Sequence, residues 1–394
     1  MSSNELPHVL HVVRSAGTGG VETHVRLMCE LYRAAGGKAS VVCLTPDKPD
    51  PAFVAAAHDF TQLNDTETWG KRSLVTVRDL YRYMKRSPAD IVHVHGARPI
   101  FAGALAARVA GKKHIVASLH GSTDLMAVRA DGSTTALGLL FARFVHGLGF
   151  VLSKRIVVCA TRLKDDVNRC LRLFGPFGLS SHRKIRVVYH GIETAPTPGE
   201  APPPRQAGTG RLRVGTLSRL DEPKKGIAFL IRAVKALQDA GTVVSLRIAG
   251  NGYSRKDLEH LAATLALADC QFVGFVKDPR DFYRDIDVFV LSSLSEGMPL
   301  VNLEAMASGV PVITTDVGGA AEAVLDGQSG LVVPPADTDS LARAIGRLES
   351  NRAEAARLAA AGQHRVMNNF TVATTFSRLQ SVYAEGTTRR PEKR

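Results

Sequence analysis

Residues 212–226 read LRVGTLSRLDEPKKG, and this stretch decides the fold. The apolar run Leu212–Leu217 predicts a buried strand, and the charged segment after it predicts a turn. The apolar spacing of Gly226–Ala240 then predicts a helix that packs on the strand. The same order of strand, turn and helix recurs in both halves of the chain. Strands that alternate with helices indicate a parallel sheet covered on both faces, so we predict the doubly wound α/β class.

This alternation sets the other expected elements. In the second half, strands are expected at Val243–Ala249, Cys270–Val273, Val288–Leu291, Val310–Thr314 and Gly330–Val333, and helices at Ser254–Leu267, Asn302–Ser308 and Ser340–Ser350. In the first half, strands are expected at His8–Val13, Ala39–Leu44, Ile91–Val94, His114–Leu119, Arg155–Cys159 and Ile185–Tyr189, and helices at Val21–Ala35, Pro99–Ala110 and Leu137–Leu152.

A segment between the halves breaks the pattern. Residues 195–210 read APTPGEAPPPRQAGTG, in which eight of sixteen residues are Pro or Gly and no apolar periodicity is left. That composition is typical of a linker. We therefore predict two Rossmann-like domains at 1–195 and 211–370, joined by a Pro/Gly-rich linker at 196–210. A C-terminal helix at about 371–385 is expected to pack back on the first domain.

The composition is ordinary for a soluble globular protein, with 45% hydrophobic and 22% charged residues. The longest stretch without a charged side chain, Val366–Ser377, has twelve residues, whereas a membrane-spanning helix needs about 20 apolar ones. The N-terminus has no signal-peptide core. The five cysteines are scattered and form no Cys-x-x-Cys pair, which favours reduced thiols over a disulfide framework or a zinc site. We expect a cytoplasmic protein.

The net charge of +13 is concentrated in the first half. Residues 1–195 hold 26 Lys and Arg against 15 Asp and Glu (+11), and residues 196–394 hold 24 against 22 (+2). A basic surface attracts nucleic acid, anionic lipid or a phosphorylated substrate, although it can also be plain solvated surface. Aromatic residues are only 6% and do not interleave with the basic pairs, which argues against nucleic acid. Those pairs are Lys71-Arg72, Lys85-Arg86, Lys112-Lys113 and Lys154-Arg155.

Candidate site residues of the first half follow its predicted strands, where a doubly wound sheet binds its ligands. Gly19 and Gly20 open the first helix, so their backbone could approach a phosphate. Glu22 stands where a dinucleotide fingerprint needs glycine. His120 follows the strand His114–Leu119. His93 and His95 share one face of their strand, but no carboxylate or cysteine clusters near them in sequence, so we interpret them as core or site-lining residues instead of metal ligands.

The second half offers two charged groups. Arg219 and Lys225 flank the turn after Leu212–Leu217 and could neutralise a diphosphate, although such a turn can also be a solvated basic surface. Glu296 follows the strand Val288–Leu291, and Glu304 lies one turn into the next helix. These two acids could accept hydrogen bonds from sugar and ribose hydroxyls, or they could simply be a helix cap and a solvated acid. The backbone N–H groups of Gly297, Met298, Pro299 and Leu300 (proline apart) adjoin the pair.

The order of these motifs resembles glycosyltransferase family 4, over roughly residues 8 to 350. Its landmarks here are the Gly-Gly turn, Ser118–Gly121, Arg219-x5-Lys225-Gly, and Glu296-x7-Glu304, with Ile248–Gly252, Ser308–Gly319 and Asp326–Pro334. The resemblance implies the GT-B fold, in which two Rossmann-like domains face each other across a cleft. The family often has Asn-Gly where this chain has His190-Gly191.

The resemblance also implies roles for the candidate residues. Arg219 and Lys225 match the diphosphate pair, Glu304 matches the acid that holds the ribose, and Glu296 and His120 match residues beside the transferred sugar. Gly20 and Gly19 lie in the loop near the donor phosphate. The base is expected near Val273 and Phe275, through backbone contacts. Gly297, Met298, Pro299 and Leu300 complete the expected donor site.

The implied reaction moves a hexose from a nucleotide diphosphate sugar to an acceptor hydroxyl with retention of configuration. No metal or cofactor is expected, because Asp285-Ile-Asp287 leads into an apolar strand and does not resemble the Asp-x-Asp of metal-dependent enzymes. A UDP-sugar is favoured only because such donors are common. The basic first half suggests an anionic, lipid-linked acceptor of envelope or surface polysaccharide assembly, at the inner face of the plasma membrane.

Three alternatives stay open at this point. A small soluble acceptor would leave the basic surface without a role. A nicotinamide-dependent oxidoreductase would share the architecture but lacks the glycine fingerprint. A non-catalytic nucleotide-binding or nucleic-acid-binding protein would explain the charge but not the order of the motifs.

Overall fold

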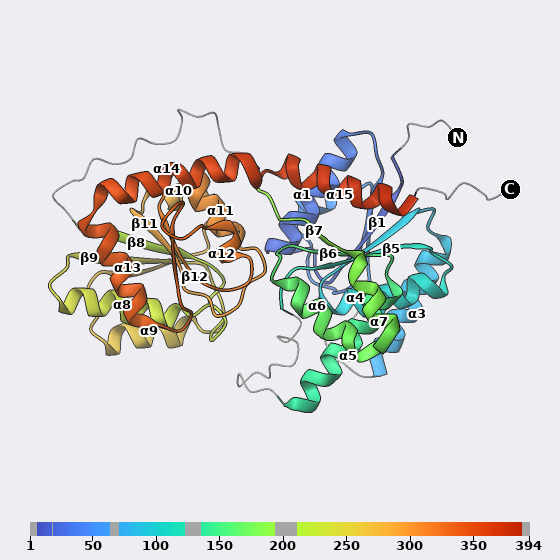
Figure 1. The fold of residues 1–394 in the computed structure, drawn as a ribbon, viewed down its shortest axis with the longest axis horizontal. Coiled ribbons are helices and arrows are strands. Elements are labelled where there is room, and N and C mark those ends of the chain that lie inside the picture. Colours follow the sequence, from blue (N-terminus) through green and yellow to red (C-terminus); the bar gives the residue numbers. More distant parts are fainter. Residues whose placement is uncertain (1–5, 18, 64–70, 123–134, 194–210, 388–394) are drawn as a thin grey trace. The chain divides into compact units, whose positions relative to one another are not determined.

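The computed structural model describes residues 6–17, 19–63, 71–122, 135–193 and 211–387 (Figure 1). The chain forms two compact units, one made of residues 1–190 with 372–394 and the other of residues 191–371. The linker expected at 196–210 lies outside the described residues. No described helix is long and apolar enough to span a bilayer.

The first unit contains a seven-stranded parallel sheet in the order β3-β2-β1-β4-β5-β6-β7. Its strands are β1 (Val9–Val13), β2 (Ala39–Cys43), β3 (Asp59–Gln62), β4 (Ile91–His95), β5 (His114–Leu119), β6 (Arg155–Val158) and β7 (Ile185–Val187). Its helices are α1 (Gly20–Ala34), α2 (Pro51–Ala56), α3 (Lys71–Arg86), α4 (Ala97–Val109), α5 (Ala136–Leu152), α6 (Leu163–Leu171), α7 (Gly175–Ser181) and α15 (Val372–Thr387).

The second unit contains a six-stranded parallel sheet in the order β10-β9-β8-β11-β12-β13. Its strands are β8 (Leu212–Leu217), β9 (Val244–Ala249), β10 (Cys270–Gly274), β11 (Val288–Leu291), β12 (Val312–Thr315) and β13 (Leu331–Val333). Its helices are α8 (Ile227–Asp239), α9 (Arg255–Thr264), α10 (Pro279–Arg284), α11 (Leu300–Ala307), α12 (Ala320–Ala323), α13 (Thr338–Ser350) and α14 (Arg352–Asn369).

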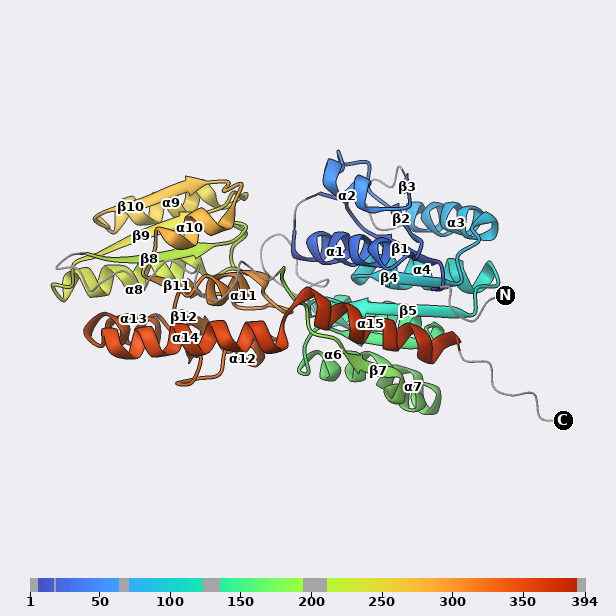
Figure 2. The ribbon, with the colours of Figure 1, turned by 90° about the horizontal axis from the view of Figure 1, so that it is seen from above.

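Both sheets are covered by helices on their two faces, which confirms the predicted doubly wound α/β class. Figure 1 shows α1 and α15 on one face of the first sheet, with α4 and α5 on the other. Strands buried on both faces read as continuous apolar runs, as in β1 and β2. In Figure 2 the C-terminal helix α15 lies along the first unit, and its Leu379 and Val382 enter the same core as Val9 and Val41.

The strand order places a switch point in each unit. In the first unit the order reverses between β1 and β4, and in the second it reverses between β8 and β11. Ligands of such sheets bind at the carboxyl ends of the strands that flank this point. The loops after β8 and β11 are those that carry the predicted basic and acidic residues.

Several expected strand bounds differ from the structure by one residue, and two differ by more for a local reason. The strand expected at Val310–Thr314 begins at Val312, because Pro311 has no N–H to give to the ladder, although its carbonyl accepts from Phe289. The strand expected at Ile185–Tyr189 ends at Val187. Beyond it the backbone of Val188 still donates to Val158, and the chain then turns away.

Candidate active site

An ion pair lies at the switch point of the second unit. Lys225, in the loop after β8, places its Nζ 2.6 Å from Oε1 of Glu296, in the loop after β11. Ser293 donates its hydroxyl to the same carboxylate oxygen at 2.7 Å. The two charged side chains are only 14% and 10% exposed. The structure therefore brings together two of the predicted site residues, one cation and one anion, in a partly desolvated position.

The neighbouring lysines keep Glu296 ionised. Burial alone would raise the pKa of this carboxyl, but the charges of Lys225 and Lys224 and the hydrogen bonds from Lys225 and Ser293 outweigh it. The net result is a pKa of Glu296 below its ordinary value. Burial also lowers the pKa of Lys224, which Glu296 partly offsets. Lys224 thus belongs to the same electrostatic cluster, although the sequence analysis assigned it no role.

Backbone contacts hold these two loops together. The N–H of Leu294 donates to the carbonyl of Lys224 at 2.8 Å, and the hydroxyl of Ser292 donates to the carbonyl of Lys225 at 3.2 Å. Gly226 follows at φ +59°, a left-handed conformation that favours glycine. A Cβ at Gly226 would overlap the carbonyl oxygen of Ser292. Gly226 therefore allows the loop that carries the lysines to pack against the segment after β11.

Arg219 does not join the cluster in this structure. Its side chain is 68% exposed, and its guanidinium lies 3.4 Å from the carboxylate of Asp221. The sequence suggested that Arg219 and Lys225 point at one anion, but here only Lys225 lies against Glu296. Arg219 remains in the same loop, where a side chain so exposed has the freedom to change rotamer.

Glu304 lies on α11 and has a partner from α10. The hydroxyl of Tyr283 lies 3.1 Å from Oε2 of Glu304 and 3.2 Å from the carbonyl oxygen of Val301. Burial raises the pKa of Glu304, and the hydrogen bond from Tyr283 lowers it by less, so the net pKa is above the ordinary value. Tyr283 is itself almost fully buried. Tyr283 was not among the predicted site residues, because nothing in the spacing of its segment pairs it with α11.

The loop before α11 offers backbone donors. Gly297, Met298, Pro299 and Leu300 are buried, and no side chain caps the start of α11. Gly318, at φ +49°, packs so closely that a Cβ there would overlap the carbonyl oxygen of Glu296. By contrast, Glu222 accepts the first N–H of α8 at 2.5 Å. The start of α8 is therefore occupied, whereas no described side chain accepts from the first N–H groups of α11.

The other predicted residues of the second unit lie at separate places. Val273 is the next-to-last residue of β10, and Phe275 directly follows the strand. Both residues are exposed, at 42% and 67%. Asp285 and Asp287 lie before β11, at the amino end of the sheet. Asp287 binds Arg213 at 2.6 Å and Asp285 binds Arg247 at 3.1 Å, so both acids have structural partners.

In the first unit, the Gly-Gly turn leads from β1 into α1. Gly19 is the residue before the helix, Gly20 is its first residue, and the carbonyl of Gly19 accepts from the N–H of Thr23. The hydroxyl of Ser15 donates to Glu22, at 2.5 Å, across this turn. Thr18 lies outside the described residues.

His120 directly follows β5 and has both ring nitrogens engaged. Its Nε2 lies 3.1 Å from Nδ1 of His95, and its Nδ1 lies 2.9 Å from Nε2 of His190. Burial, with a smaller effect of His24, lowers the pKa of His120 to about 3. The ring is therefore neutral at ordinary pH, so His120 can act as a hydrogen-bonding group but not as a cation.

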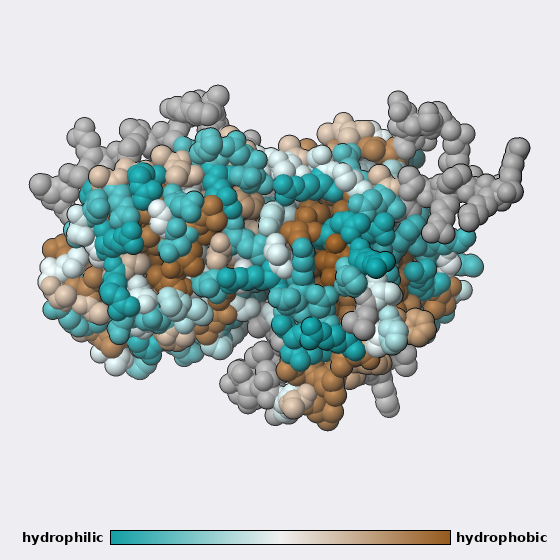
Figure 3. Space-filling model, in the orientation of Figure 1, coloured by the Kyte–Doolittle hydropathy of each residue, from teal (hydrophilic) through white to brown (hydrophobic). Residues whose placement is uncertain are grey.

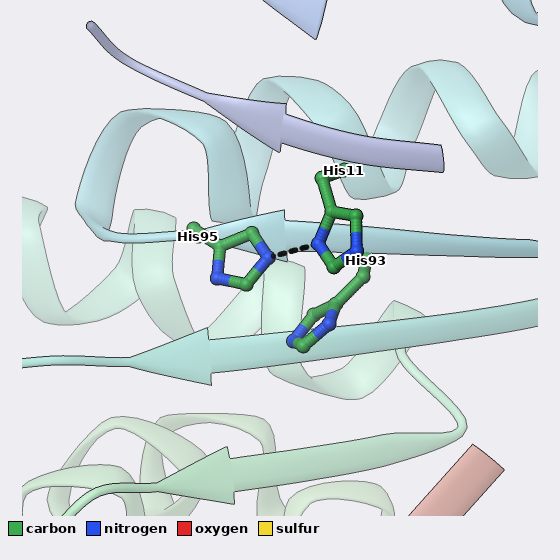
Figure 4. A group of neighbouring side chains, drawn as sticks. All are labelled: His11, His93 and His95. Atoms are coloured by element: carbon green, nitrogen blue, oxygen red, sulfur yellow. Dashed lines mark hydrogen bonds between the residues drawn. The ribbon is translucent and has the colours of Figure 1, made fainter. Parts of the chain in front are cut away.

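The histidine contacts continue into the sheet, as Figure 4 shows for His11, His93 and His95. Nδ1 of His11 lies 2.9 Å from Nε2 of His95. The ring centroids of His93 and His95 lie 3.9 Å apart, with the two rings tilted by 37°. His93 has its own partners, Tyr383 of α15 at 2.7 Å and Ser118 of β5 at 2.6 Å. The interpretation of His93 and His95 as core residues agrees with this packing, but the hydrogen-bonded row of histidines was not foreseen.

Comparison with known proteins identifies the class. The model "Glycosyltransferase Family 4" matches residues 18–196, and the model "Glycosyl transferases group 1" matches residues 211–351. A glycogen synthase of Mycobacterium tuberculosis is 29% identical, over 95% of this chain and 94% of the relative. A GDP-mannose-dependent alpha-(1-6)-phosphatidylinositol monomannoside mannosyltransferase of Mycolicibacterium smegmatis is 30% identical, over 69% of this chain and 70% of the relative.

The crystal structure of Alr3699/HepE from Anabaena, in complex with UDP and glucose, matches with a TM-score of 0.76 at 19% identity, over 96% of this chain and 99% of that one. The two Rossmann-like units thus have the GT-B fold, and the matched family models and relatives define a glycosyltransferase. The chain belongs to glycosyltransferase family 4. The predicted family and fold are confirmed, whereas the roles of the individual site residues stay predictions.

Proposed function

We propose that the chain transfers a hexose from a nucleoside diphosphate sugar to an acceptor hydroxyl, with retention of configuration and without a metal ion. The observation that carries this proposal is the Lys225–Glu296 pair at the switch point of the second unit. Lys224 belongs to the same cluster, and α11, which follows the loop of Glu296, has an uncapped start and carries the carboxylate of Glu304. This set contains positive charge for a diphosphate and carboxylates for hydroxyl groups.

The chemistry follows from where charge develops. When the bond between the sugar C1 and the phosphate oxygen breaks, C1 becomes positive and the nucleoside diphosphate gains a negative charge. Lys225, Arg219 and the N–H groups before α11 would stabilise that leaving group, and such preorganised electrostatics is usually the largest catalytic effect. The leaving phosphate would accept the proton of the acceptor hydroxyl, and the new bond forms on the face that the phosphate left. Glu296 would bind sugar hydroxyls, and Glu304 would bind the ribose.

A UDP-sugar is the donor that we propose first. The Anabaena structure matched by the fold holds UDP and glucose, and the exposed Phe275 at the carboxyl end of the sheet could stack on a base. The M. smegmatis relative is named for GDP-mannose, so a GDP-sugar is the alternative. An acid that binds the ribose and a lysine that binds the diphosphate contact parts that UDP and GDP share, so these residues do not distinguish uracil from guanine.

Slow donor hydrolysis, in which water replaces the acceptor, tests this function without a known acceptor. The chain is incubated with UDP-glucose, GDP-mannose or ADP-glucose, with and without EDTA, and the released sugar is followed by NMR. We expect one donor to be hydrolysed, at the same rate in EDTA, with the α-anomer released first from an α-linked donor. Release of the β-anomer would contradict retention, and loss of the reaction in EDTA would contradict metal independence.

For the acceptor, we propose an anionic lipid-linked molecule reached at a membrane surface. One face of α5 exposes apolar side chains at helical spacing, namely Leu137, Leu140, Phe141 and Phe144. Figure 3 shows this apolar patch on the surface over α5. Phe177 of α7, which packs on α5, is 79% exposed, and Arg172, in the turn that also packs on α5, is exposed as well. An apolar helix face beside basic residues in a positively charged unit suits an anionic lipid surface.

Vesicle sedimentation tests the membrane contact. The chain is mixed at low salt with neutral phosphatidylcholine vesicles and with vesicles that also contain an anionic phospholipid. We expect preference for the anionic vesicles, weakening with salt, and loss of binding in Leu140→Ser/Phe141→Ser. Val109→Ser removes a similarly exposed apolar group from α4 and should bind like the original. Equal binding to neutral and anionic vesicles, or none to either, would instead favour the soluble acceptor.

A further inference from the structure

Three residues with metal-binding side chains meet at the carboxyl end of the first sheet. His120 follows β5, Cys159 follows β6, and His190 lies just beyond β7, so three neighbouring strands deliver one residue each. The ligand atoms of all three lie within 4.8 Å of one another. The sequence could not show this group, because its members are about 30 to 40 positions apart along the chain.

The same residues border a small cavity. His120, Cys159 and His190 line it together with His24 of α1 and Ser118. Two buried ring nitrogens of this lining have no hydrogen-bond partner, Nδ1 of His24 and Nδ1 of His190. Their side chains are 5% and 4% exposed. Both residues line the cavity, so its wall holds polar groups that the described residues leave unsatisfied.

The other histidine group does not have these features. His11, His93 and His95 also lie close together, but both nitrogens of His93 bond groups outside the trio, Tyr383 and Ser118, whereas Nδ1 of His120 bonds another member of its own site. The rings of His11 and His95 stack at an interplanar angle of 27° (Figure 4), whereas ligand rings would turn their edges toward a common point. All three are at most 2% exposed. We therefore treat them as a hydrogen-bonded core and not as a metal site.

We propose that His120, Cys159 and His190 form a binding site for Zn²⁺ or a similar soft divalent ion. Two imidazoles and a thiolate are a donor set that zinc prefers, and three protein ligands leave a fourth position for water or another small ligand. His120 is only partly buried, so an ion can reach the site from its side of the cavity.

The row of histidines can hold the tautomers that metal binding requires, with no net gain or loss of protons by the rings. In the metal-free state, Nδ1 of His120 and Nε2 of His190 share one hydrogen. Nδ1 of His120 and Nε2 of His190 can both bind the ion if neither carries a hydrogen. His120 then carries its hydrogen on Nε2, and His190 carries its hydrogen on Nδ1. Nε2 of His120 then donates to Nδ1 of His95, which is already 3.1 Å away. Ligand histidines commonly have such a partner for their second nitrogen. The thiol of Cys159 loses its proton to solvent as the metal–sulfur bond forms.

Metal binding has a consequence for catalysis that rests on the proposed function. A ring of His120 bound to zinc is held away from the sugar, so the occupied site inhibits transfer. Zinc would then act as a reversible inhibitor of an enzyme whose reaction needs no metal. His190, which completes the site, stands where the family often has asparagine.

Titration of the full chain with Co²⁺ and Zn²⁺ tests the site directly. We expect one ion per chain, with the thiolate-to-cobalt absorption that a cysteine ligand produces, and displacement of Co²⁺ by Zn²⁺. Cys159→Ser should abolish that absorption, and His190→Asn should weaken zinc binding at least about tenfold. Cys43→Ser, which replaces another buried cysteine of the same unit, should behave like the original. Absence of stoichiometric binding, or an unchanged absorption in Cys159→Ser, would overturn the proposal.

Two further measurements keep the test decisive. If a variant does not fold, the original chain can be treated with a thiol reagent and its labelled cysteines found by peptide mapping. We expect Zn²⁺ to protect Cys159 from labelling and to leave the labelling of Cys43 unchanged. Equal labelling of Cys159 with and without zinc would overturn the site. Donor hydrolysis should fall when zinc fills the site and recover in EDTA, and His190→Asn should resist zinc. Binding without inhibition would overturn only the inhibitory role, and failure of donor hydrolysis itself would count against the proposed function and not against the site.

Discussion

Lys225 and Glu296 are each held by the other before any substrate arrives. Their ion pair, joined by Ser293, is only slightly exposed. A diphosphate that binds Lys225 must therefore compete with Glu296 for the ammonium group. A sugar whose hydroxyls bind Glu296 weakens the hold of Glu296 on Lys225 and so makes the diphosphate contact easier. This exchange couples the two halves of a nucleotide sugar, because its phosphate and its hexose each satisfy one partner of the pair.

Replacing Glu296 should separate binding from turnover. In Glu296→Gln, Lys225 loses its carboxylate partner and is left to bind phosphate, so we expect UDP affinity to be maintained or increased. Donor hydrolysis should nevertheless fall at least about tenfold, because a carboxylate near the developing positive charge is gone. Calorimetry with UDP and the hydrolysis assay measure the two effects. Glu259→Gln, which removes an exposed acid paired with Arg255, is the control; a parallel loss of both properties would contradict the exchange.

The buried Glu304 should give donor binding an acid limit. Its pKa is raised by burial, so as pH falls through this raised value the carboxylate is protonated and can no longer accept two ribose hydrogen bonds. UDP affinity should therefore fall on the acid side. Tyr283 donates to Glu304 and lowers that pKa, so Tyr283→Phe should move the fall to higher pH. Calorimetry across pH measures the midpoint, with Tyr253→Phe as control, and an unmoved midpoint would contradict the assignment.

Sequence patterns located the charged residues of the site but not their partners. Arg219, Lys225, Glu296 and Glu304 stood out because they follow predicted strands in a fixed order. Tyr283 and Ser293 did not, because their contacts with the two acids arise from the packing of α10 and of the loop after β11. The histidine row depends on strand register, which pairs His11 with His93 and His95 with Ser118. Sequence alone does not give that register.

At the scale of elements, the site depends on loops that lock against one another. The loop after β11 is joined to the segment after β12 by a hydrogen bond from the N–H of Gly319 to the carbonyl of Gly297 at 2.5 Å. Gly318 makes this approach feasible, since a side chain there would strike the carbonyl of Glu296. The positions of Glu296 and of the N–H groups before α11 therefore rest on one glycine.

A pair of matched glycine variants tests this dependence. Gly318 and Gly327 both have positive φ values, +49° and +66°, but only Gly318 has neighbours where a Cβ would go. Gly327→Ala should cost about 1 kcal/mol of unfolding free energy from backbone strain alone. Gly318→Ala should cost clearly more and should also weaken UDP binding. Chemical denaturation and calorimetry compare them, and equal effects of the two substitutions would contradict the packing argument.

The predicted elements match best where apolar strands are buried on both faces. The bounds of His114–Leu119, Leu212–Leu217 and Val288–Leu291 were predicted correctly. The edge strand β3, DFTQ, was missed because it is short, mostly polar and not fully buried at any residue. The helix α14 was missed because its buried face is made mostly of alanine and glycine, which give little periodic signal.

At the scale of the whole molecule, the chain passes from one unit to the other and returns. It leaves the first unit after His190 and comes back at Val372, so α15 completes the first core although it is the last helix in sequence. Alternation of strands and helices predicted two sheets, and the Pro/Gly-rich segment predicted a division near residue 200. The boundary itself, at His190 and Gly191, follows from where the strand β7 ends its pairing, which composition does not reveal.

Thermal unfolding should separate the two units. We expect two calorimetric transitions, of which only that of the second unit is raised by UDP, because a ligand stabilises the unit that binds it. Leu379→Ala in α15 should lower the transition temperature of the first unit. Its unfolding free energy should fall by about 2–5 kcal/mol, the usual cost of truncating a buried leucine to alanine. Leu348→Ala, equally buried in the second unit, should lower the transition that UDP raises. A single transition shifted by both substitutions and by UDP would contradict this division.

The claim on which the account depends is that Lys225, with Arg219, binds the diphosphate of the donor. Calorimetric titration of UDP and UMP into the original chain, Lys225→Ala and Arg219→Ala measures this directly. We predict that the original binds UDP at least about tenfold more tightly than UMP, because the second phosphate gains charge-assisted contacts, and that Lys225→Ala removes that preference. A Lys225→Ala chain that still prefers UDP over UMP by the original factor would contradict the account.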